Sequence, residues 1–213
     1  MEFIEPFHVI LDDFNGEEVL SKIEFCGRVC YKSENRMTSG SAQKFVRSII
    51  KSGHESVLEH FSFSVRFVVS RAVANEIVRH RIASYSQEST RFCNYKNRGV
   101  EIVIPKNMND YYNYEWICEN AVEAYNELLE NGYKPEIARG ILPLDLKTEL
   151  IMTTNLREWR HFLKLRCDSH AHPEMRRVTI PLLDELHNRI PVVFDDIYAS
   201  IHNEAKEHGN EEV

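Results

Sequence analysis

Residues 61–81 read FSFSVRFVVSRAVANEIVRHR, and their pattern changes from period two to helical spacing at Ser70. From Phe61 to Val69, apolar residues alternate with serine and arginine, which predicts a strand with one buried face. Ser70 is a favoured N-cap residue, and the run from Ser70 to Arg81 predicts a helix. The strand therefore places the basic end of this helix at the edge of a sheet, where sites are commonly built.

The segment Arg79–Arg91, which we call the basic corner, is rich in hydrogen-bond donors. It holds three arginines and one histidine among three serines, a threonine and a glutamine, a surface suited to phosphate oxygens. The alternative is that the cations are solvated charges that favour the dipole at the end of a helix. Ser84–Arg91 lacks apolar periodicity, glycine and proline, so we expect a long polar loop that something organises, which favours an anion site.

Length and charge limit the kind of protein. The chain has 213 residues and no Gly/Ser/Pro-rich linker, so we expect one domain over residues 1–213 with a disordered tail at 209–213. The formal net charge is -7, yet residues 66–98 carry seven Arg or Lys against two acids, whereas residues 108–130 are strongly acidic. An acidic protein with a basic pocket suits a small phosphorylated ligand better than nucleic acid.

Cysteine usage and hydropathy suggest a reduced cytoplasmic protein with no membrane partner. The five cysteines form no C-x-x-C pair, and no apolar segment has signal-peptide or membrane length. Cys26 and Cys30 lie four apart on one helical face, which indicates small core residues rather than a metal or redox pair. The segment His54–His60 has Leu58 where a zinc motif needs a second histidine, so we expect no metal.

The other segments alternate between strand and helix patterns. We interpret the aromatic stripe that includes Tyr112 and Trp116 as core packing rather than a stacking platform. The fold class expected is α+β, a single domain with a small, mostly antiparallel sheet covered by helices. Further strands are expected at Phe7–Leu11, Glu101–Ile104 and Thr148–Thr154, and helices at Glu17–Tyr31, Ala42–Lys51, Asn109–Asn131, Asn155–Cys167, Pro173–His187 and Asp195–Glu207, with a short helix from Pro135.

The helix predicted from Asn155 is crowded with cations. It carries five basic or imidazole side chains against one acid, Glu158. Like charges on one helix repel each other, so we expect anions to share its surface.

Spacing within the basic corner resembles a family signature. Arg79-His80-Arg81 is followed by seven residues and then Ser89, with Arg91 two residues later. This pattern resembles the flavin-dependent thymidylate synthases, which methylate dUMP without a cysteine nucleophile, and further matches extend the resemblance over residues 7–200.

The resemblance implies reductive methylation of dUMP to dTMP, with methylenetetrahydrofolate as carbon donor, FAD as hydride carrier and NADPH as reductant. FAD and NADPH come from the resemblance alone, because the sequence has no G-x-G-x-x-G and no P-loop. The basic segments cannot all neutralise one another within one chain, and the resemblance implies sites shared between subunits, so we expect a homotetramer.

The resemblance also implies roles for individual residues. Arg166 is expected to stabilise negative charge on the N3/O2 edge of uracil so that C5 becomes nucleophilic, which makes it the catalytic residue. His54 is expected on the folate side, and His170 falls on a family histidine nearby. Flavin contacts are expected from Ser56, Glu59, Arg79, His80, Arg81, Gln87, Asn155, Arg157 and His161. Substrate contacts are expected from Glu76, Arg79, Gln87, Glu88, Ser89, Thr90, Arg91, Arg166 and His54, with Arg139 reaching the phosphate from a neighbouring subunit.

Three positions depart from the family pattern. Glu76 stands where glutamine is common, and its carboxylate would repel a phosphate unless it contacts ribose or uracil. Ser86-Gln87 replaces the more common Asn-Glu, and His161 replaces a frequent asparagine. Both replacements keep hydrogen-bonding capacity.

Other interpretations of the same residues stay open. Ser89 has no adjacent base pattern, and the helical phase of Cys167 favours burial, so neither is favoured as a nucleophile. Without the resemblance, Arg139 is a surface arginine in a loop. The rival function is a non-catalytic nucleotide- or RNA-binding protein that uses the same arginines for phosphates.

Overall fold

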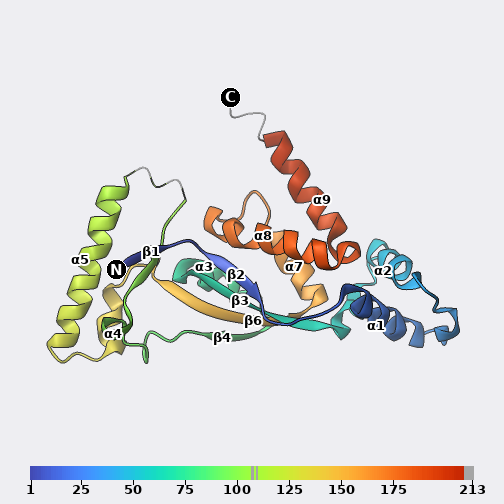
Figure 1. The fold of residues 1–213 in the computed structure, drawn as a ribbon, viewed down its shortest axis with the longest axis horizontal. Coiled ribbons are helices and arrows are strands. Elements are labelled where there is room, and N and C mark those ends of the chain that lie inside the picture. The colour runs from blue at the N-terminus through green and yellow to red at the C-terminus, as the bar shows by residue number, and fades with distance from the viewer. Residues whose placement is uncertain (107, 109, 209–213) are drawn as a thin grey trace. The chain divides into compact units, whose positions relative to one another are not determined.

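The computed structural model describes residues 1–106, 108 and 110–208 (Figure 1), so the tail predicted at 209–213 lies outside the described residues. The fold is α+β with a small, mostly antiparallel sheet, as the sequence predicts. The strands are β1 (Glu2–Ile4), β2 (Phe7–Ile10), β3 (Ser62–Ser70), β4 (Ser84–Gln87), β5 (Glu101–Val103) and β6 (Lys147–Asn155). The α-helices are α1 (Gly16–Val29), α2 (Ser41–Lys51), α3 (Arg71–Ile77), α4 (Tyr95–Arg98), α5 (Tyr111–Glu130), α6 (Pro135–Ala138), α7 (Leu156–Arg166), α8 (Pro173–Arg189) and α9 (Pro191–His208). Short 3-10 helices are η1 (Glu34–Arg36), η2 (Glu55–His60) and η3 (Arg139–Ile141).

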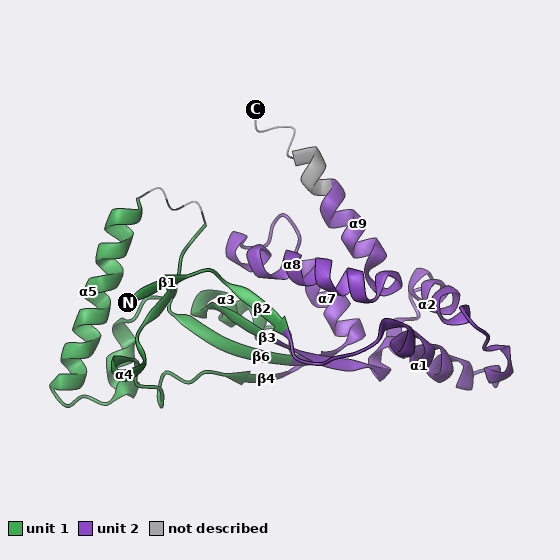
Figure 2. Ribbon diagram, in the orientation of Figure 1, with its two compact units in different colours: residues 1–9, 66–81, 85–152 green, residues 10–65, 82–84, 153–213 purple. Residues whose placement is uncertain are grey.

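The chain divides into two compact units, coloured separately in Figure 2. Unit 1 comprises residues 1–9, 66–81 and 85–152, and unit 2 comprises residues 10–65, 82–84 and the chain from Thr153. The expectation of one domain stays a prediction.

The four-stranded sheet has the order β2-β3-β6-β4, and β1 pairs with β5 in parallel, with Phe3 opposite Ile102. β3 is the predicted alternating strand, with Phe63, Val65 and Phe67 at most 1% exposed. Sequence patterns missed β1 and β4. Both are short, and β4 is a polar edge strand whose apolar period is absent.

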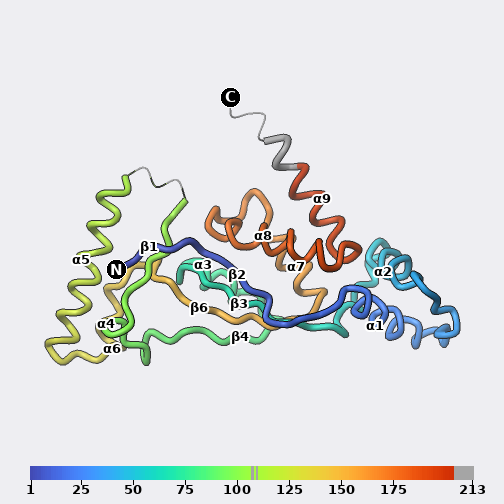
Figure 3. The backbone as a smooth tube through the Cα atoms, in the orientation of Figure 1, coloured from blue at the N-terminus to red at the C-terminus, as the bar shows by residue number. Residues whose placement is uncertain are grey.

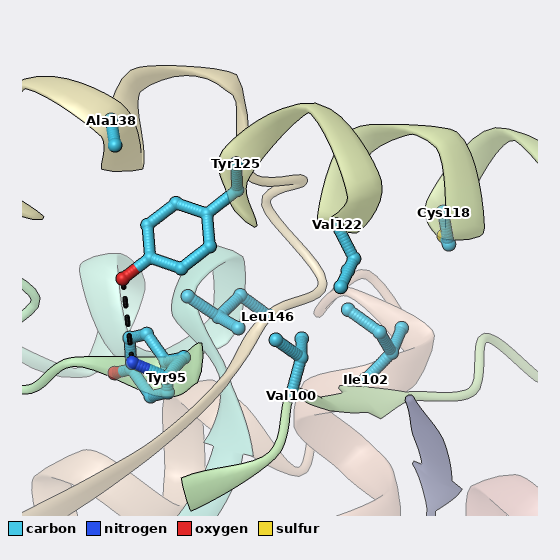
Figure 4. Close-up of a cluster of buried hydrophobic side chains, with 8 residues drawn as sticks. All are labelled: Tyr95, Val100, Ile102, Cys118, Val122, Tyr125, Ala138 and Leu146. Carbon is cyan, nitrogen blue, oxygen red and sulfur yellow. Dashed lines mark hydrogen bonds between the residues drawn. The ribbon is translucent and has the colours of Figure 1, made fainter. Parts of the chain in front are cut away.

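The core of unit 1 lies between α5 and the segments around β5 and β6 (Figure 4). Tyr125 is fully buried on α5, and its hydroxyl accepts the backbone N–H of Tyr95 at 3.3 Å. The aromatic stripe was predicted wrongly in part, because Tyr112 is 79% and Trp116 58% exposed. The buried face of α5 is instead Cys118, Val122 and Tyr125, and the predicted start at Asn109 lies outside the described residues.

The core of unit 2 is built on α7. Trp159 is fully buried, stacks on Phe63 with ring centroids 5.0 Å apart, and donates its indole N–H to the Phe63 carbonyl. Asn155 caps α7 as predicted, since its side chain accepts the backbone N–H of Glu158 at 3.0 Å. The backbone path in Figure 3 shows α9 rising at an angle from the end of α8. α8 and α9 contact each other, and both contact α7.

Two further features of the described residues bear on the sequence predictions. Cys26 is half-buried, but Cys30 is exposed because α1 ends at Val29, so the core assignment is wrong for Cys30. None of the helices in the described ranges combines the length and hydropathy needed to cross a bilayer.

Candidate functional site

The predicted site residues divide between the two units, and each unit is described by itself. Unit 1 holds the predicted nucleotide contacts Glu76, Arg79, Gln87, Glu88, Ser89, Thr90, Arg91 and Arg139, together with His80 and Arg81, which were predicted to contact the flavin. Unit 2 holds His54, Ser56, Glu59, Asn155, Arg157, His161, Arg166 and His170.

A cavity of about 500 Å³ opens in unit 2 along the exposed side of α7. Four residues predicted to contact the flavin line it together, namely Glu59, Asn155, Arg157 and His161. Sequence reasoning did not assign four others in its wall, namely Glu55, Glu158, Arg160 and Lys164. For Lys164, the sequence signal was its spacing: residues 157, 161 and 164 recur at helical intervals and so share one helix face.

Two cations of α7 are neutralised by carboxylates of the protein itself. Arg157 pairs with Glu59 at 2.6 Å on the surface, where both side chains are about half exposed. Arg160 is buried and reaches Asp196 through both amino groups, at 2.8 and 2.7 Å, and Glu55 at 3.2 Å. For Arg157 and Arg160, carboxylates from η2 and α9 thus supply anions of the kind expected on this helix.

Burial raises the pKa of the Glu158 carboxyl, which lies in the cavity wall, while His161 and Arg157 oppose that shift. This carboxyl can therefore hold a proton nearer neutral pH than an exposed glutamate does. Together with the cations of α7, it gives the cavity both hydrogen-bond donors and acceptors.

The remaining residues of the unit 2 set lie outside the cavity wall. His54, which directly precedes η2, and Ser56 within it are both exposed. Arg166 is half-buried in the last turn of α7, and its backbone carbonyl accepts the Thr179 hydroxyl at 2.9 Å. His170 is exposed, and its ring nitrogen lies 2.8 Å from the Asp168 carboxylate.

In unit 1 the helix before the basic corner is shorter than predicted. The Ser70 hydroxyl caps α3 as expected, accepting the Val73 N–H at 3.2 Å, but the helix ends at Ile77. The Tyr85 hydroxyl lies 3.0 Å from the Ile77 carbonyl and 2.6 Å from the His80 carbonyl, and so satisfies groups that a longer helix would have used.

Arg79 and Arg81 therefore lie beyond the helix, not in its last turn. Both are exposed, whereas His80 between them is buried. Residues 84–87 form β4 rather than the predicted loop. Hydrogen bonding to β6 continues one residue past β4, since the Glu88 N–H donates to the Glu149 carbonyl at 2.9 Å. The sheet itself therefore organises the basic corner.

The turn after β4 gathers donors around Ser89–Arg91. The Ser89 hydroxyl accepts the Arg91 N–H at 3.3 Å. Thr90 is buried and accepts a hydrogen bond of 2.7 Å from Arg139, beside a cavity of about 230 Å³ that both residues line. Arg91 is exposed and pairs with Glu136 at 3.4 Å. Arg139 thus lies beside the predicted phosphate turn of its own chain, and its action on another subunit stays a prediction.

Comparison with known proteins identifies the family. The family model described as thymidylate synthase complementing protein matches residues 12–192. The flavin-dependent thymidylate synthase of Geobacter sulfurreducens is 34% identical over 185 residues, which cover 82% of this chain and 80% of that protein. The chain belongs to the flavin-dependent thymidylate synthase family.

Other members of the family show similar agreement. The flavin-dependent thymidylate synthase of Mycobacterium tuberculosis is 36% identical over 196 residues, covering 82% of this chain and 78% of that protein. The one from Corynebacterium efficiens is 33% identical over 218 residues, covering 91% and 85%. The chain is therefore an enzyme of flavin-dependent thymidylate synthesis, and the resemblance seen in the basic corner is confirmed.

The thiol of Cys167 is not suited to attack a substrate. It is fully buried, and burial raises its pKa to about 12. The thiolate is the reactive form, so Cys167 is almost entirely unreactive at neutral pH.

Selective alkylation tests this burial. Iodoacetamide at pH 8 is expected to alkylate exposed Cys30 in the native protein. The rate of alkylation at Cys167 is expected to be lower by a factor of at least about 100. Peptide mass spectrometry at timed intervals measures both rates, and the unfolded protein serves as the control in which both react. Equal native rates at the two cysteines would contradict the burial.

Proposed function

We propose that this enzyme converts dUMP to dTMP, with methylenetetrahydrofolate as carbon donor, FAD as hydride carrier and NADPH as reductant. The observation that supports this most is the grouping of Glu59, Asn155, Arg157 and His161 around one cavity of about 500 Å³. Its size falls within the roughly 300–1,000 Å³ typical of small-molecule sites.

The donor set of the cavity fits part of a flavin nucleotide. Arg157, His161 and Lys164 are exposed on one face of α7 and line the cavity. Their N–H groups can bind the carbonyls of a flavin ring or the oxygens of its diphosphate. When bound, FAD supplies the hydride chemistry. The protein supplies binding, orientation and charge.

The nucleotide is proposed to bind at the basic corner. Ser89, Arg91 and the backbone amides after β4 hold the phosphate, and Arg79 and Gln87 are proposed as contacts of both ligands. Arg139 reaches the phosphate from a neighbouring subunit. Glu76 meets ribose or uracil, because its carboxylate would repel the phosphate.

Arg166 is proposed to act on the uracil ring. A guanidinium is always protonated and carries paired planar donors, so it stabilises negative charge on the N3/O2 edge. That charge makes C5 electron-rich enough to accept the one-carbon unit without a thiol nucleophile. His54 and Ser56 lie on the folate and flavin sides of the ring, and His170 lies nearby.

We further propose a cytoplasmic homotetramer with sites shared between subunits. Light scattering at micromolar concentration tests the assembly. A mass equal to that of one chain, 25.0 kDa, would overturn this part.

Product formation tests the reaction. Incubation with dUMP, methylenetetrahydrofolate, FAD and NADPH is expected to give dTMP by chromatography, and omitting any one of the four is expected to abolish it. If no dTMP forms while the protein binds RNA tightly with a steep salt dependence, the non-catalytic RNA-binding alternative is the better account.

A further inference from the structure

A cluster of charges in unit 1 joins Glu88, one of the predicted substrate contacts, to three residues with no assigned role, Lys147, Glu101 and Glu149. Lys147, at the start of β6, lies 3.1 Å from Glu101, 3.2 Å from Glu149 and 3.7 Å from Glu88. Its side chain is 14% exposed and that of Glu88 is 16% exposed, so both charges are largely withdrawn from water. Burial disfavours the charged form of Lys147, but the three carboxylates outweigh it and raise its pKa.

Glu88 is held on several sides. One carboxylate oxygen accepts the Tyr95 hydroxyl at 3.0 Å, and the other accepts the backbone N–H of Glu149 at 3.3 Å. The Glu88 carbonyl lies 3.4 Å from an amino group of Arg71, at the start of α3. The side chain of Glu88 is thus turned toward β6 and α4, and its role as a substrate contact stays a prediction.

Tyr95 connects the Glu88 carboxylate to the core of unit 1. Tyr95 is 5% exposed, and its backbone N–H donates to the buried Tyr125 (Figure 4). Burial and the neighbouring Glu88 carboxylate raise the pKa of the Tyr95 hydroxyl, so it stays a proton donor to Glu88.

Glu88 directly precedes Ser89 and the turn where the proposed function places the phosphate of dUMP. A carboxylate so close to a phosphate site weakens anion binding unless its charge is balanced and its position fixed. Lys147 supplies a compensating positive charge 3.7 Å from Glu88, which it shares with Glu101 and Glu149. Tyr95 together with the Glu149 amide fixes the position of the Glu88 carboxylate.

We propose that Lys147 and Tyr95 are positioning residues that neutralise and immobilise the Glu88 carboxylate so that the Ser89–Arg91 turn can bind the nucleotide phosphate. This inference rests on the proposed function. Lys147→Met is expected to raise the KM for dUMP about tenfold with kcat changed less than about twofold, because a free carboxylate repels the substrate before and during reaction alike.

A rescue experiment separates charge from structure. Adding Glu88→Gln to Lys147→Met is expected to return the KM for dUMP to within about threefold of wild type, because the repelling charge is gone. Lys147→Met with Glu101→Gln is the matched control. It removes a second carboxylate of the cluster, 3.1 Å from Lys147 in the wild type but thirteen residues from Glu88, and is expected to give no rescue.

Tyr95→Phe is a second variant, which keeps the aromatic ring in the core but removes the hydroxyl that donates to Glu88. The KM for dUMP is expected to rise about threefold, and adding Glu88→Gln is expected to reverse this rise.

Calorimetric titration with dUMP and with deoxyuridine provides a readout besides activity. Only dUMP affinity is expected to change, since deoxyuridine carries no phosphate. Equal rescue by Glu101→Gln, no change in KM in either single variant, or an equal loss of deoxyuridine binding would overturn the inference. A wild-type protein that forms no dTMP and binds no dUMP would instead overturn the proposed function.

Discussion

Replacing Arg166 with alanine is expected to lower kcat for dTMP formation about 10³-fold, the scale of removing one preorganised charge at a reacting oxygen. Arg166 sits in the last turn of α7, half-buried, where its backbone carbonyl is fixed by the Thr179 hydroxyl. The side chain is therefore anchored at its base. Steady-state formation of dTMP measures the effect.

Two further variants test whether the effect depends on the guanidinium group at position 166. Arg166→Lys keeps the charge but loses the paired planar donors, so it is expected to recover only about tenfold of the lost rate. Arg47→Ala removes an arginine of α2 whose side chain is 62% exposed, and it is expected to leave kcat unchanged. An alanine variant that keeps more than a tenth of the wild-type kcat would remove Arg166 from the mechanism.

Replacing Arg160 with alanine is expected to cost about 3–5 kcal/mol of unfolding free energy, because it leaves the charges around it uncompensated. Arg160 joins α7 to Asp196 on α9 and to Glu55 on η2, and it also donates to the Val193 carbonyl. For a chain of this size, the loss corresponds to a fall in Tm of roughly 6–20 °C. Thermal and urea unfolding measure it.

Arg157→Ala is the matched control on the same helix. Arg157 also pairs with a glutamate, but both partners are about half exposed, so the expected loss of unfolding free energy is much smaller than in Arg160→Ala. Flavin affinity is expected to fall in Arg157→Ala instead. Equal loss of stability in the two variants would contradict the distinction between a buried and a surface pair.

The same cluster predicts a pH effect on stability. Burial favours the protonated form of Asp196, but Arg160 outweighs it and lowers the pKa of Asp196 below its ordinary value of 3.8. A carboxylate whose pKa is lowered in the folded state stabilises the protein at any pH above the ordinary carboxyl pKa. This contribution is lost as the pH falls through the lowered, folded-state pKa. Arg160→Ala lacks this contribution, so the difference in unfolding free energy between wild type and Arg160→Ala is expected to shrink as the pH falls through that range. Urea unfolding at a series of pH values measures it.

Segments with strong periodicity were predictable from sequence. β3 alternates, α7 begins at the Asn155 cap, and α6 begins at Pro135, because each depends on local rules. The signature of the basic corner indicated the family for a different reason. The spacing of its arginines, histidine and serine reflects the residues that a binding site needs, not the periodicity of a helix or strand.

Other features depend on contacts distant in sequence. α3 stops at Ile77 because Tyr85 meets its carbonyls, and β4 forms because β6 offers a partner. Trp116 is exposed although it falls on the predicted stripe, since the face of α5 that is buried is set by β5 and Leu146. Lys147 and Tyr95 belong to no motif, and only the folded chain brings them to Glu88.

The central claim is that flavin and nucleotide chemistry meet in this protein, and the visible absorption spectrum tests it most directly. In an anaerobic cuvette, the purified protein loaded with FAD is expected to show flavin bands that bleach on adding NADPH, and to bleach faster when dUMP is present. A colourless protein that takes up no FAD, or bound flavin that NADPH leaves unchanged with and without dUMP, would contradict the account.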